Sequence, residues 1–175
     1  MAKLTNGQAN IVELQGTSGS APANDRYTGF REIMHDYPGM KIIDSAEGDF
    51  TVAKGKEVMK DFLKAHGKVI TAVYAHNDDM ALGAIQAIEE YGLKPGVDIK
   101  IVSVDAARGA FEAMIAGKLN ATVECNPLLG PQFFELALKV VNGEPVPKWI
   151  PSQESQFLAS QGADELKQIL NTREY

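Results

Sequence analysis

The chain has 175 residues, and 45% of them are hydrophobic, which is enough for one substantial domain with an apolar core. Its 17 Lys and Arg against 23 Asp and Glu give a net charge of −6, and the charges are scattered along the chain. This distribution excludes the basic surface that binding to nucleic acid requires. The single cysteine, Cys125, excludes an internal disulfide and a cysteine-rich metal site.

The first ten residues, MAKLTNGQAN, lack the basic start and the apolar run of a secretory signal. The sequence also has no apolar stretch of about 18 residues that could cross a bilayer. We therefore expect a soluble chain that is mature or truncated.

Short runs of β-branched residues alternate with amphipathic segments over the first 125 residues. The pattern predicts strands at residues 9–14, 40–45, 68–75, 98–105 and 119–125. Helices are predicted at residues 25–36 with Asn24 as N-cap, at 51–66, from Asn77 or Asp78 to 91, and at 108–116. Strand–helix–strand units of this size require right-handed crossovers. The predicted fold is α/β, with a doubly wound parallel sheet covered by helices on both faces.

The regular alternation weakens after Pro127. A helix is predicted at residues 128–142, at most short edge pairing in the proline-containing stretch 145–158, and a final helix at 163–171. We therefore divide the chain into a core, residues 1–127, and a C-terminal part, residues 128–175.

Polar side chains and one aromatic ring follow the predicted strands. Ligands of open α/β sheets bind beyond the carboxyl ends of the strands, so these residues are candidates for a binding site. Amide, carboxylate and guanidinium groups can pair with adjacent hydroxyls of a polyol, while an aromatic ring covers its apolar face. The candidate residues are Asn24, Arg26, Phe50, Asn77, Asp105 and Asn126.

Each of these residues also has a purely structural interpretation. Asn77 can serve only as a helix N-cap, and Asp105 can be a carboxylate that orders a loop. Arg26 can be a solvated helix residue, and Phe50 can close the core. These alternatives stay open from the residues alone.

Catalytic patterns are weak in this sequence. The histidines His35, His66 and His76 lie in three different segments without metal-ligand spacing. The loop GTSGSA after the first strand matches neither a P-loop nor GxGxxG nor the GxSxG of esterases. Cys125 is expected to be a partly buried small residue. We therefore predict a protein that is not an enzyme and uses no metal or cofactor.

The segment AHNDDMALGAIQAIEEYGLKPGVDIKIVSVDA, residues 75–106, carries a specific resemblance. Together with ELQGT, the D-R-x-x-G-F continuation, GDFTVAKGKEVM and ATVECNP, in this order, it resembles the ribose- and galactofuranose-type periplasmic binding proteins of ABC importers. The resemblance covers residues 6–170. The ligand-sensing domains of LacI-type repressors share this fold and some of these motifs.

The resemblance implies a fold of two similar lobes joined by a hinge, with the sugar held between them. This chain resembles the second lobe alone, and residues 1–6 resemble the tail of a helix. By resemblance, Asn77 and Asp105 hydrogen-bond sugar hydroxyls, Phe50 lines the site, and Asn24 or Arg26 falls near the family's arginine. The ribose branch ends its fifth strand with a glutamine contact, and Cys125 stands here, followed by Asn126.

The resemblance therefore implies binding of a monosaccharide, a pentose or a hexose such as galactofuranose, without turnover. It also implies a periplasmic location and, for the full-length protein, the membrane subunits of an ABC importer as partners. Residues 128–142 would cross the hinge, so their apolar side chains need another surface here, either the chain itself or a second copy in a homodimer. The alternatives are the ligand-sensing domain of a LacI-type repressor, which needs an upstream helix-turn-helix, and a flavodoxin-like enzyme.

Overall fold

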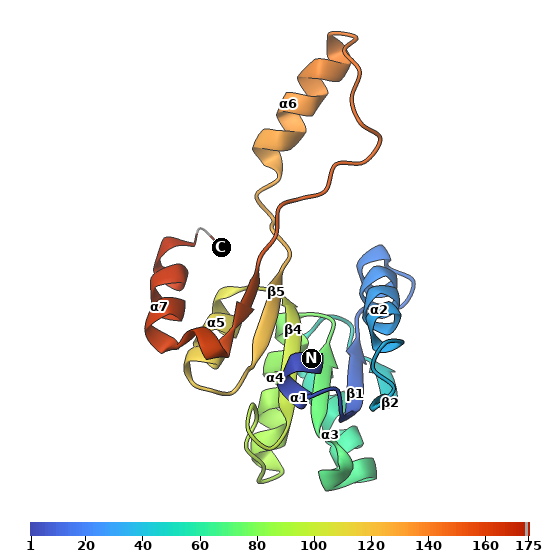
Figure 1. The fold of residues 1–175 in the computed structure, drawn as a ribbon, viewed down its shortest axis with the longest axis vertical. Coiled ribbons are helices and arrows are strands. Elements are labelled where there is room, and N and C mark those ends of the chain that lie inside the picture. Colours follow the sequence, from blue (N-terminus) through green and yellow to red (C-terminus); the bar gives the residue numbers. More distant parts are fainter. Residues whose placement is uncertain (174) are drawn as a thin grey trace.

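The computed structural model describes residues 1–173 and 175. One six-stranded sheet with strand order β2-β1-β3-β4-β5-β6 forms its centre (Figure 1). The first five strands pair in parallel, and β6 joins the edge antiparallel to β5, which confirms the predicted α/β fold. The strands are β1 (Ala9–Gln15), β2 (Met40–Glu47), β3 (Ala72–Ala75), β4 (Lys100–Asp105), β5 (Ala121–Glu124) and β6 (Gln156–Leu158).

Helices cover the two faces of the sheet unequally. Successive side chains of a strand point to opposite faces, so Val12 and Leu14 of β1 enter the larger core while Ala9 and Ile11 enter the smaller one. Helices α3, α4, α5 and α7 pack on the first face, and α1 and α2 on the second. The helices are α1 (Ala2–Thr5), α2 (Ala21–Met34), α3 (Val52–His66), α4 (Asp78–Glu90), α5 (Arg108–Ile115), α6 (Gly130–Val141) and α7 (Ala163–Thr172), with 3-10 turns at Gly67–Val69 and Ala159–Gln161.

The second face keeps an open, mostly apolar groove of about 630 Å³ between α1, α2 and the strands β3 to β5. Phe30 and Met34 of α2 line one side, and Val102 and Val104 of β4 form part of the floor. One 14-residue helix, α2, and the four-residue α1 are too few to cover five strands, so this face is less completely packed than the first.

Two predicted boundaries are wrong by four residues. Helix α2 begins at Ala21, four residues before the predicted start, because the Ser20 side chain is the N-cap and accepts from the Ala23 N–H, while a proline occupies the first turn. Asn24 therefore lies inside the helix, exposed, and is not its cap. Strand β3 begins only at Ala72, because a 3-10 turn occupies Gly67–Val69. The predicted start of α4 is confirmed, with Asn77 as N-cap.

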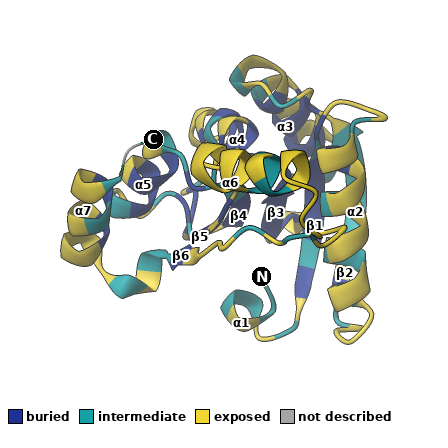
Figure 2. Cartoon of the chain, turned by 90° about the horizontal axis from the view of Figure 1, so that it is seen from above, coloured by how far each residue is buried: buried dark blue, intermediate teal, exposed yellow. Residues whose placement is uncertain are grey.

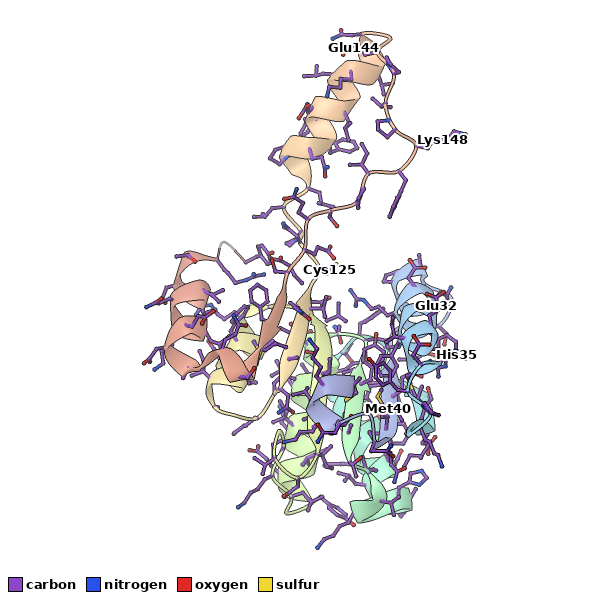
Figure 3. The ribbon with its side chains drawn as sticks, viewed as in Figure 1. Glu32, His35, Met40, Cys125, Glu144 and Lys148 are labelled. Atoms are coloured by element: carbon purple, nitrogen blue, oxygen red, sulfur yellow. The ribbon has the colours of Figure 1, made fainter. Side chains whose placement is uncertain are left out.

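A hairpin-like arm built from residues 125–155 projects away from the sheet and carries α6 (Figure 1). We call it the α6 arm. Cys125 lies at its base, Glu144 lies at its far end, and Lys148 lies on the segment that returns toward the sheet (Figure 3). Seen from above, α6 is almost entirely exposed (Figure 2). After the arm, β6 returns to the sheet and α7 packs beside α5.

None of the helices in the described part of the chain combines the length and the hydropathy that a membrane span requires.

Candidate functional site

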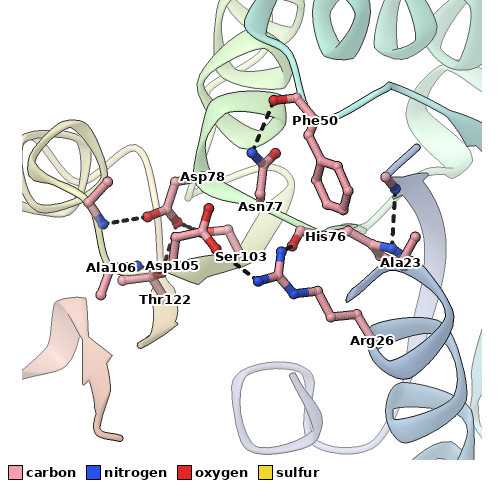
Figure 4. Close-up of polar contacts among 12 residues, drawn as sticks. Ala23, Arg26, Phe50, His76, Asn77, Asp78, Ser103, Asp105, Ala106 and Thr122 are labelled. Atoms are coloured by element: carbon pink, nitrogen blue, oxygen red, sulfur yellow. Dashed lines mark hydrogen bonds and ion pairs between the residues drawn. The ribbon is translucent and has the colours of Figure 1, made fainter. Parts of the chain in front are cut away.

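Four of the six candidate side chains come together at the carboxyl edge of the sheet: Arg26, Phe50, Asn77 and Asp105 (Figure 4). Each follows a different strand, because Arg26 lies on α2 after β1, Phe50 precedes α3, Asn77 caps α4, and Asp105 ends β4. We call these four residues the rim cluster. The chain moves outward from β1 to β2 and then returns to β3 on the other side of β1, which is the topological switch where open α/β sheets bind ligands.

Arg26 joins the loops after β3 and β4. One guanidinium nitrogen, Nη1, donates to the His76 carbonyl at 2.5 Å, and Nη2 donates to Asp105 Oδ1 at 2.9 Å. The centre of the guanidinium also lies 5.6 Å from the centroid of the Phe50 ring. Its side chain is only 16% exposed, so the interpretation of Arg26 as a solvated helix residue is wrong.

Asn77 links the start of α4 to the Phe50 backbone. Its Oδ1 accepts from the Met80 N–H at 3.0 Å, and its Nδ2 donates to the Phe50 carbonyl at 3.1 Å. The amide therefore performs the capping role and also fixes the residue whose ring belongs to the rim cluster. One N–H of the Asn77 amide is left over for another acceptor.

Two rim residues have left-handed backbone conformations that side chains other than glycine's rarely adopt. Phe50 has φ 56° and Asp105 has φ 123°. Residues in such conformations are strained and persist only where their surroundings determine them, and they are concentrated at functional sites. The neighbouring residues Asp49 and Ala106 share this property, with φ 51° and 60°.

The Phe50 ring lies directly against the backbone of Gly16. A Cβ placed on Gly16 would lie 1.9 Å from the Phe50 Cζ atom, so only glycine allows this approach. The Gly16 N–H in turn donates to His76 Nδ1 at 3.2 Å. The loop after β1 is thereby held against both the aromatic ring and the buried histidine.

A network of charged and polar side chains, Glu13, His76 and Arg31, lies beside the rim cluster. His76 Nε2 lies 3.3 Å from Glu13 Oε1, and Arg31 forms a two-pronged ion pair with the same carboxylate at 2.7 and 2.8 Å. Because the Gly16 N–H donates to Nδ1, the proton of the His76 ring is on Nε2 and faces Glu13. Both side chains are fully buried.

Hydrogen bonding keeps Glu13 ionised in this network. Burial alone would raise the pKa of Glu13, but hydrogen bonds from His76, Arg31, Ser45 and Gln15 outweigh burial and hold it well below its ordinary value. Glu13 is not among the candidate residues predicted from the sequence, and His76 stands there only as one of three scattered histidines. A glutamate in the middle of the apolar run IVEL was the available signal, because a charge in a buried strand requires a partner.

Opposing effects act on the pKa of the Asp105 carboxylate. Burial raises its pKa, and the charge of Asp79 acts in the same direction. The Arg26 guanidinium lowers it through its charge and its hydrogen bond, and the net shift is upward. The Asp105 side chain nevertheless remains 33% exposed, so a ligand can reach it.

Asn24 and Asn126 lie outside the rim cluster. Asn24 is an exposed residue within α2. Asn126 lies at the base of the α6 arm, where its Oδ1 accepts from the Leu128 N–H at 2.8 Å. Cys125, before it, is exposed, so the expectation of a partly buried cysteine is wrong. The β5 strand ends before this point, and the chain turns away into the arm.

Groups that could serve in catalysis are engaged in structural bonds. Ser18 Oγ donates to Glu47 at 2.5 Å, and Ser20 Oγ donates to the Thr17 carbonyl at 2.7 Å. The His76 ring is fully buried and engaged on both nitrogens. Within residues 1–173 and 175, no group of three or more His, Cys, Asp or Glu side chains is placed to hold a metal ion.

Comparison with known proteins gives the family. The family model of the periplasmic binding protein domain matches residues 1–145 of this chain. The chain belongs to the periplasmic binding protein family.

Two curated members of this family illustrate its ligands. The galactofuranose-binding protein YtfQ of Escherichia coli (strain K12) is 46% identical over 175 residues, which cover 98% of this chain and 55% of that protein. The ribose import binding protein RbsB of Salmonella typhimurium is 36% identical over 147 residues, which cover 83% of this chain and 48% of that protein. The chain thus spans about half the length of these relatives.

A solved structure of this family shares the fold closely. It is the periplasmic binding protein component of the arabinose ABC transporter from Shewanella sp. ANA-3, bound to α- and β-L-arabinofuranose, with a TM-score of 0.91 and 43% identity. The match covers 99% of this chain and 60% of that chain. The resemblance seen in the sequence is therefore confirmed, and these periplasmic binding protein relatives bind sugars for ABC transporters.

Proposed function

We propose that this chain is the sugar-binding C-terminal lobe of a periplasmic binding protein and that it holds a monosaccharide in its furanose form at the rim cluster. The observation that carries the proposal is the convergence of Arg26, Phe50, Asn77 and Asp105 from four successive strand ends. Asn24 and Asn126 stay secondary candidates, since Asn24 is exposed on α2 and Asn126 bonds locally in the arm.

The rim cluster suits a ring that bears several hydroxyls. Asp105 Oδ1 is occupied by Arg26, so the second oxygen, Oδ2, is the acceptor for a sugar hydroxyl. Arg26 has N–H groups beyond its two recorded bonds, and the Asn77 amide has one. The Phe50 ring supplies an apolar surface for the C–H face of the sugar. A hydrogen bond to a charged group contributes about 1.5–3 kcal/mol, so these contacts are sufficient to define a weak site.

We propose the furanose form because of the sugars for which the relatives are named. One curated relative is named for galactofuranose, and the solved structure of the arabinose-transporter component contains arabinofuranose in both anomers. The ribose-binding relative is less similar, at 36% identity against 46% and 43%. A five-membered sugar ring is therefore the ligand that the comparisons favour.

The proposed function is recognition without turnover. A hydrolase or transferase needs a nucleophile and a base that converge on the bound ligand, and Ser18, Ser20 and His76 are each engaged elsewhere. We further propose that the full-length protein acts in the periplasm and delivers the sugar to the membrane subunits of an ABC importer. One relative is named for ribose import, and another is named as the periplasmic binding protein component of an ABC transporter.

The α6 arm is proposed to associate with a second copy of this chain. Five large apolar side chains on the arm are between 65% and 82% exposed, which is unusual for a monomer. The second sheet face carries an apolar groove that the chain's own helices leave open. Two unpartnered apolar surfaces on one chain favour pairing between copies. The exposed arm residues are Phe133, Phe134, Leu138, Val141 and Trp149.

A panel of methyl glycosides tests the sugar proposal. Methyl β-D-galactofuranoside and methyl α-L-arabinofuranoside are compared with their pyranose counterparts by saturation-transfer NMR on the sugar signals, which detects millimolar affinities. We expect saturable transfer to the furanosides and little to the pyranosides. Equal transfer to both ring forms would contradict the furanose assignment, and no transfer to any sugar would contradict binding by this lobe.

A further inference from the structure

A buried carboxylate that does not belong to the rim cluster lies beneath the loop after β4. Asp78, the first residue of α4, is 1% exposed and accepts three hydrogen bonds (Figure 4). Ser103 Oγ and Thr122 Oγ1 donate to Oδ1 at 2.5 and 2.8 Å, and the Ala107 N–H donates to Oδ2 at 2.7 Å. The carboxylate thus joins α4, β4, β5 and the chain that follows β4.

The same groups hold the turn that carries Asp105. Asp105 and Ala106 both have positive φ, at 123° and 60°, and neither is glycine. The Ala106 N–H donates to Thr122 Oγ1 at 3.1 Å, and the proton of that hydroxyl points to Asp78. Asp78 therefore binds the Ala107 N–H directly and the Ala106 N–H through Thr122.

The strain in this turn requires such support. A left-handed conformation at two successive residues with side chains persists only where neighbouring groups determine it. Ala106 is fully buried and contacts the larger core, so the turn cannot relax toward solvent. In this conformation the Asp105 side chain reaches Arg26, 2.9 Å away.

We propose that Asp78 is a positioning residue for the sugar site: its carboxylate, acting with Thr122, fixes the left-handed turn that aims Asp105 at Arg26 and the ligand. The proposal rests on the proposed function for its effect on affinity, but its effect on the turn is independent of any sugar. Asp78 itself is covered by protein and makes no contact with the ligand.

The chain offers a matched control for the charge at the helix start. Asp79 is the next residue in the first turn of α4 and is exposed. An acidic residue at this place stabilises the helix through its dipole, whichever of the two carries it. Asp79→Asn therefore removes the same charge from the same helix end and leaves the turn after β4 untouched.

The test compares Asp78→Asn, Thr122→Val, Thr122→Ser and Asp79→Asn in the whole chain. The first readout is the set of amide shifts and φ-dependent couplings at residues 105–107, and the second is the affinity for methyl α-L-arabinofuranoside. We expect Asp78→Asn and Thr122→Val to shift these amides and to weaken binding roughly tenfold, the effect of losing groups that orient direct ligands in metal sites. Thr122→Ser should stay close to the wild type in both readouts. Asp79→Asn should leave the φ-dependent couplings at residues 105–107 unchanged, because Asp79 acts on Asp105 only through its charge.

A core variant far from the turn separates positioning from general loss of stability. Ile99 is buried just before the start of β4, so Ile99→Val should lower thermal stability without moving the amides of residues 105–107. If Asp78→Asn does not fold, Thr122→Val and its Ser counterpart decide the question. Unchanged amides in Thr122→Val, or equal effects in Asp79→Asn, would overturn the proposal. If the wild type binds no sugar, the sugar proposal fails, while the amide measurement still decides the role of Asp78.

Discussion

Arg26 and Asp105, 79 residues apart in the sequence, form an ion pair of 2.9 Å across the carboxyl ends of β1, β3 and β4. The pair joins the helix after β1 to the last residue of β4, and the Phe50 ring lies beside it. Both residues are proposed sugar contacts. A bound hydroxyl therefore meets a donor and an acceptor whose orientation the protein has already fixed.

The first prediction concerns the shape of the Arg26 side chain. In Arg26→Lys the charge is kept, but a single ammonium cannot reproduce the planar donors that meet the His76 carbonyl and Asp105. We expect sugar affinity to fall about tenfold, equivalent to about 1.4 kcal/mol, with a smaller change in thermal stability. Calorimetric titration measures the loss. Arg108→Lys, at an exposed arginine, is the control, and an equal loss there would argue against a special role for Arg26.

The second prediction concerns Gly16. The Cβ of Gly16→Ala would collide with the Phe50 ring, so we expect the ring to move out of the rim cluster and the sugar affinity to fall. Gly29→Ala is the control, because a Cβ at that helical position meets no atom within 4 Å and should raise stability by about 0.5–1 kcal/mol. The aromatic proton shifts of Phe50 report the displacement. If the Phe50 ring does not move in Gly16→Ala, the loop after β1 has moved instead, and the prediction is contradicted.

The third prediction concerns stability against pH. Burial raises the pKa of Asp78 to about 6, despite opposing hydrogen bonds from Ser103, Ala107 and Thr122. The folded state therefore holds this proton more tightly than the unfolded chain, whose carboxyl has the ordinary value of 3.8. The contribution of Asp78 to stability is full below pH 4 and is lost as the pH rises to 6, on the order of 3 kcal/mol.

Urea unfolding between pH 3.5 and 7 measures this loss as the difference between the wild type and Asp78→Asn. Asp105, whose pKa is also raised, contributes with the same sign, so both proteins carry Asp105→Asn in this comparison to remove its contribution. Parallel pH profiles for the two proteins would mean that burial does not raise the pKa of Asp78.

The fourth prediction concerns Glu13 and has the opposite sign. The pKa of Glu13 is held below its ordinary value of 4.5, so its contribution is present above pH 4.5 and is lost as the pH falls below it. The free energy of unfolding of Glu13→Gln should therefore fall less than that of the wild type as the pH drops below 4.5. At pH 7 it should be less stable by about 2–3 kcal/mol, because Arg31 loses its buried partner while keeping some access to solvent. Equal stability of Glu13→Gln and the wild type at pH 7 would contradict this.

The fifth prediction concerns association through the α6 arm. Light scattering after size exclusion should show a dimer whose fraction rises with concentration, and Leu138→Glu should shift it toward monomer. Val97→Glu places the same charge at an exposed apolar residue on the body and should leave the dimer intact. A wild-type monomer at all concentrations would rule out pairing through the arm.

The sequence predicts the rim cluster through one rule, that ligands lie beyond the strand ends, and this rule places Arg26, Phe50, Asn77 and Asp105 correctly at one edge. Local signals were less reliable where two residues compete for one role. Asn24 is a good N-cap by type, but Ser20 followed by a proline in the first turn starts the helix earlier.

The partners of the supporting residues could not be predicted, because they are distant in the sequence. Glu13 meets Arg31 and His76 only when α2, β1 and β3 assemble, and Asp78 meets Thr122 across 44 residues. In the sequence Asp78 is one of two adjacent aspartates in a helix start, and only burial distinguishes it from Asp79. The exposed arm was expected to need another surface, but its projection depends on tertiary packing.

The most direct test of the account is an amide-shift titration of isotopically labelled chain with methyl β-D-galactofuranoside and methyl α-L-arabinofuranoside, in the wild type and in Asp105→Asn. We predict saturable shifts confined to the loops that contain Arg26, Phe50, Asn77 and Asp105, with millimolar affinity that Asp105→Asn weakens at least tenfold. Shifts that map to the groove between α1 and α2, or that persist unchanged in Asp105→Asn, would contradict the placement of the sugar at the rim cluster.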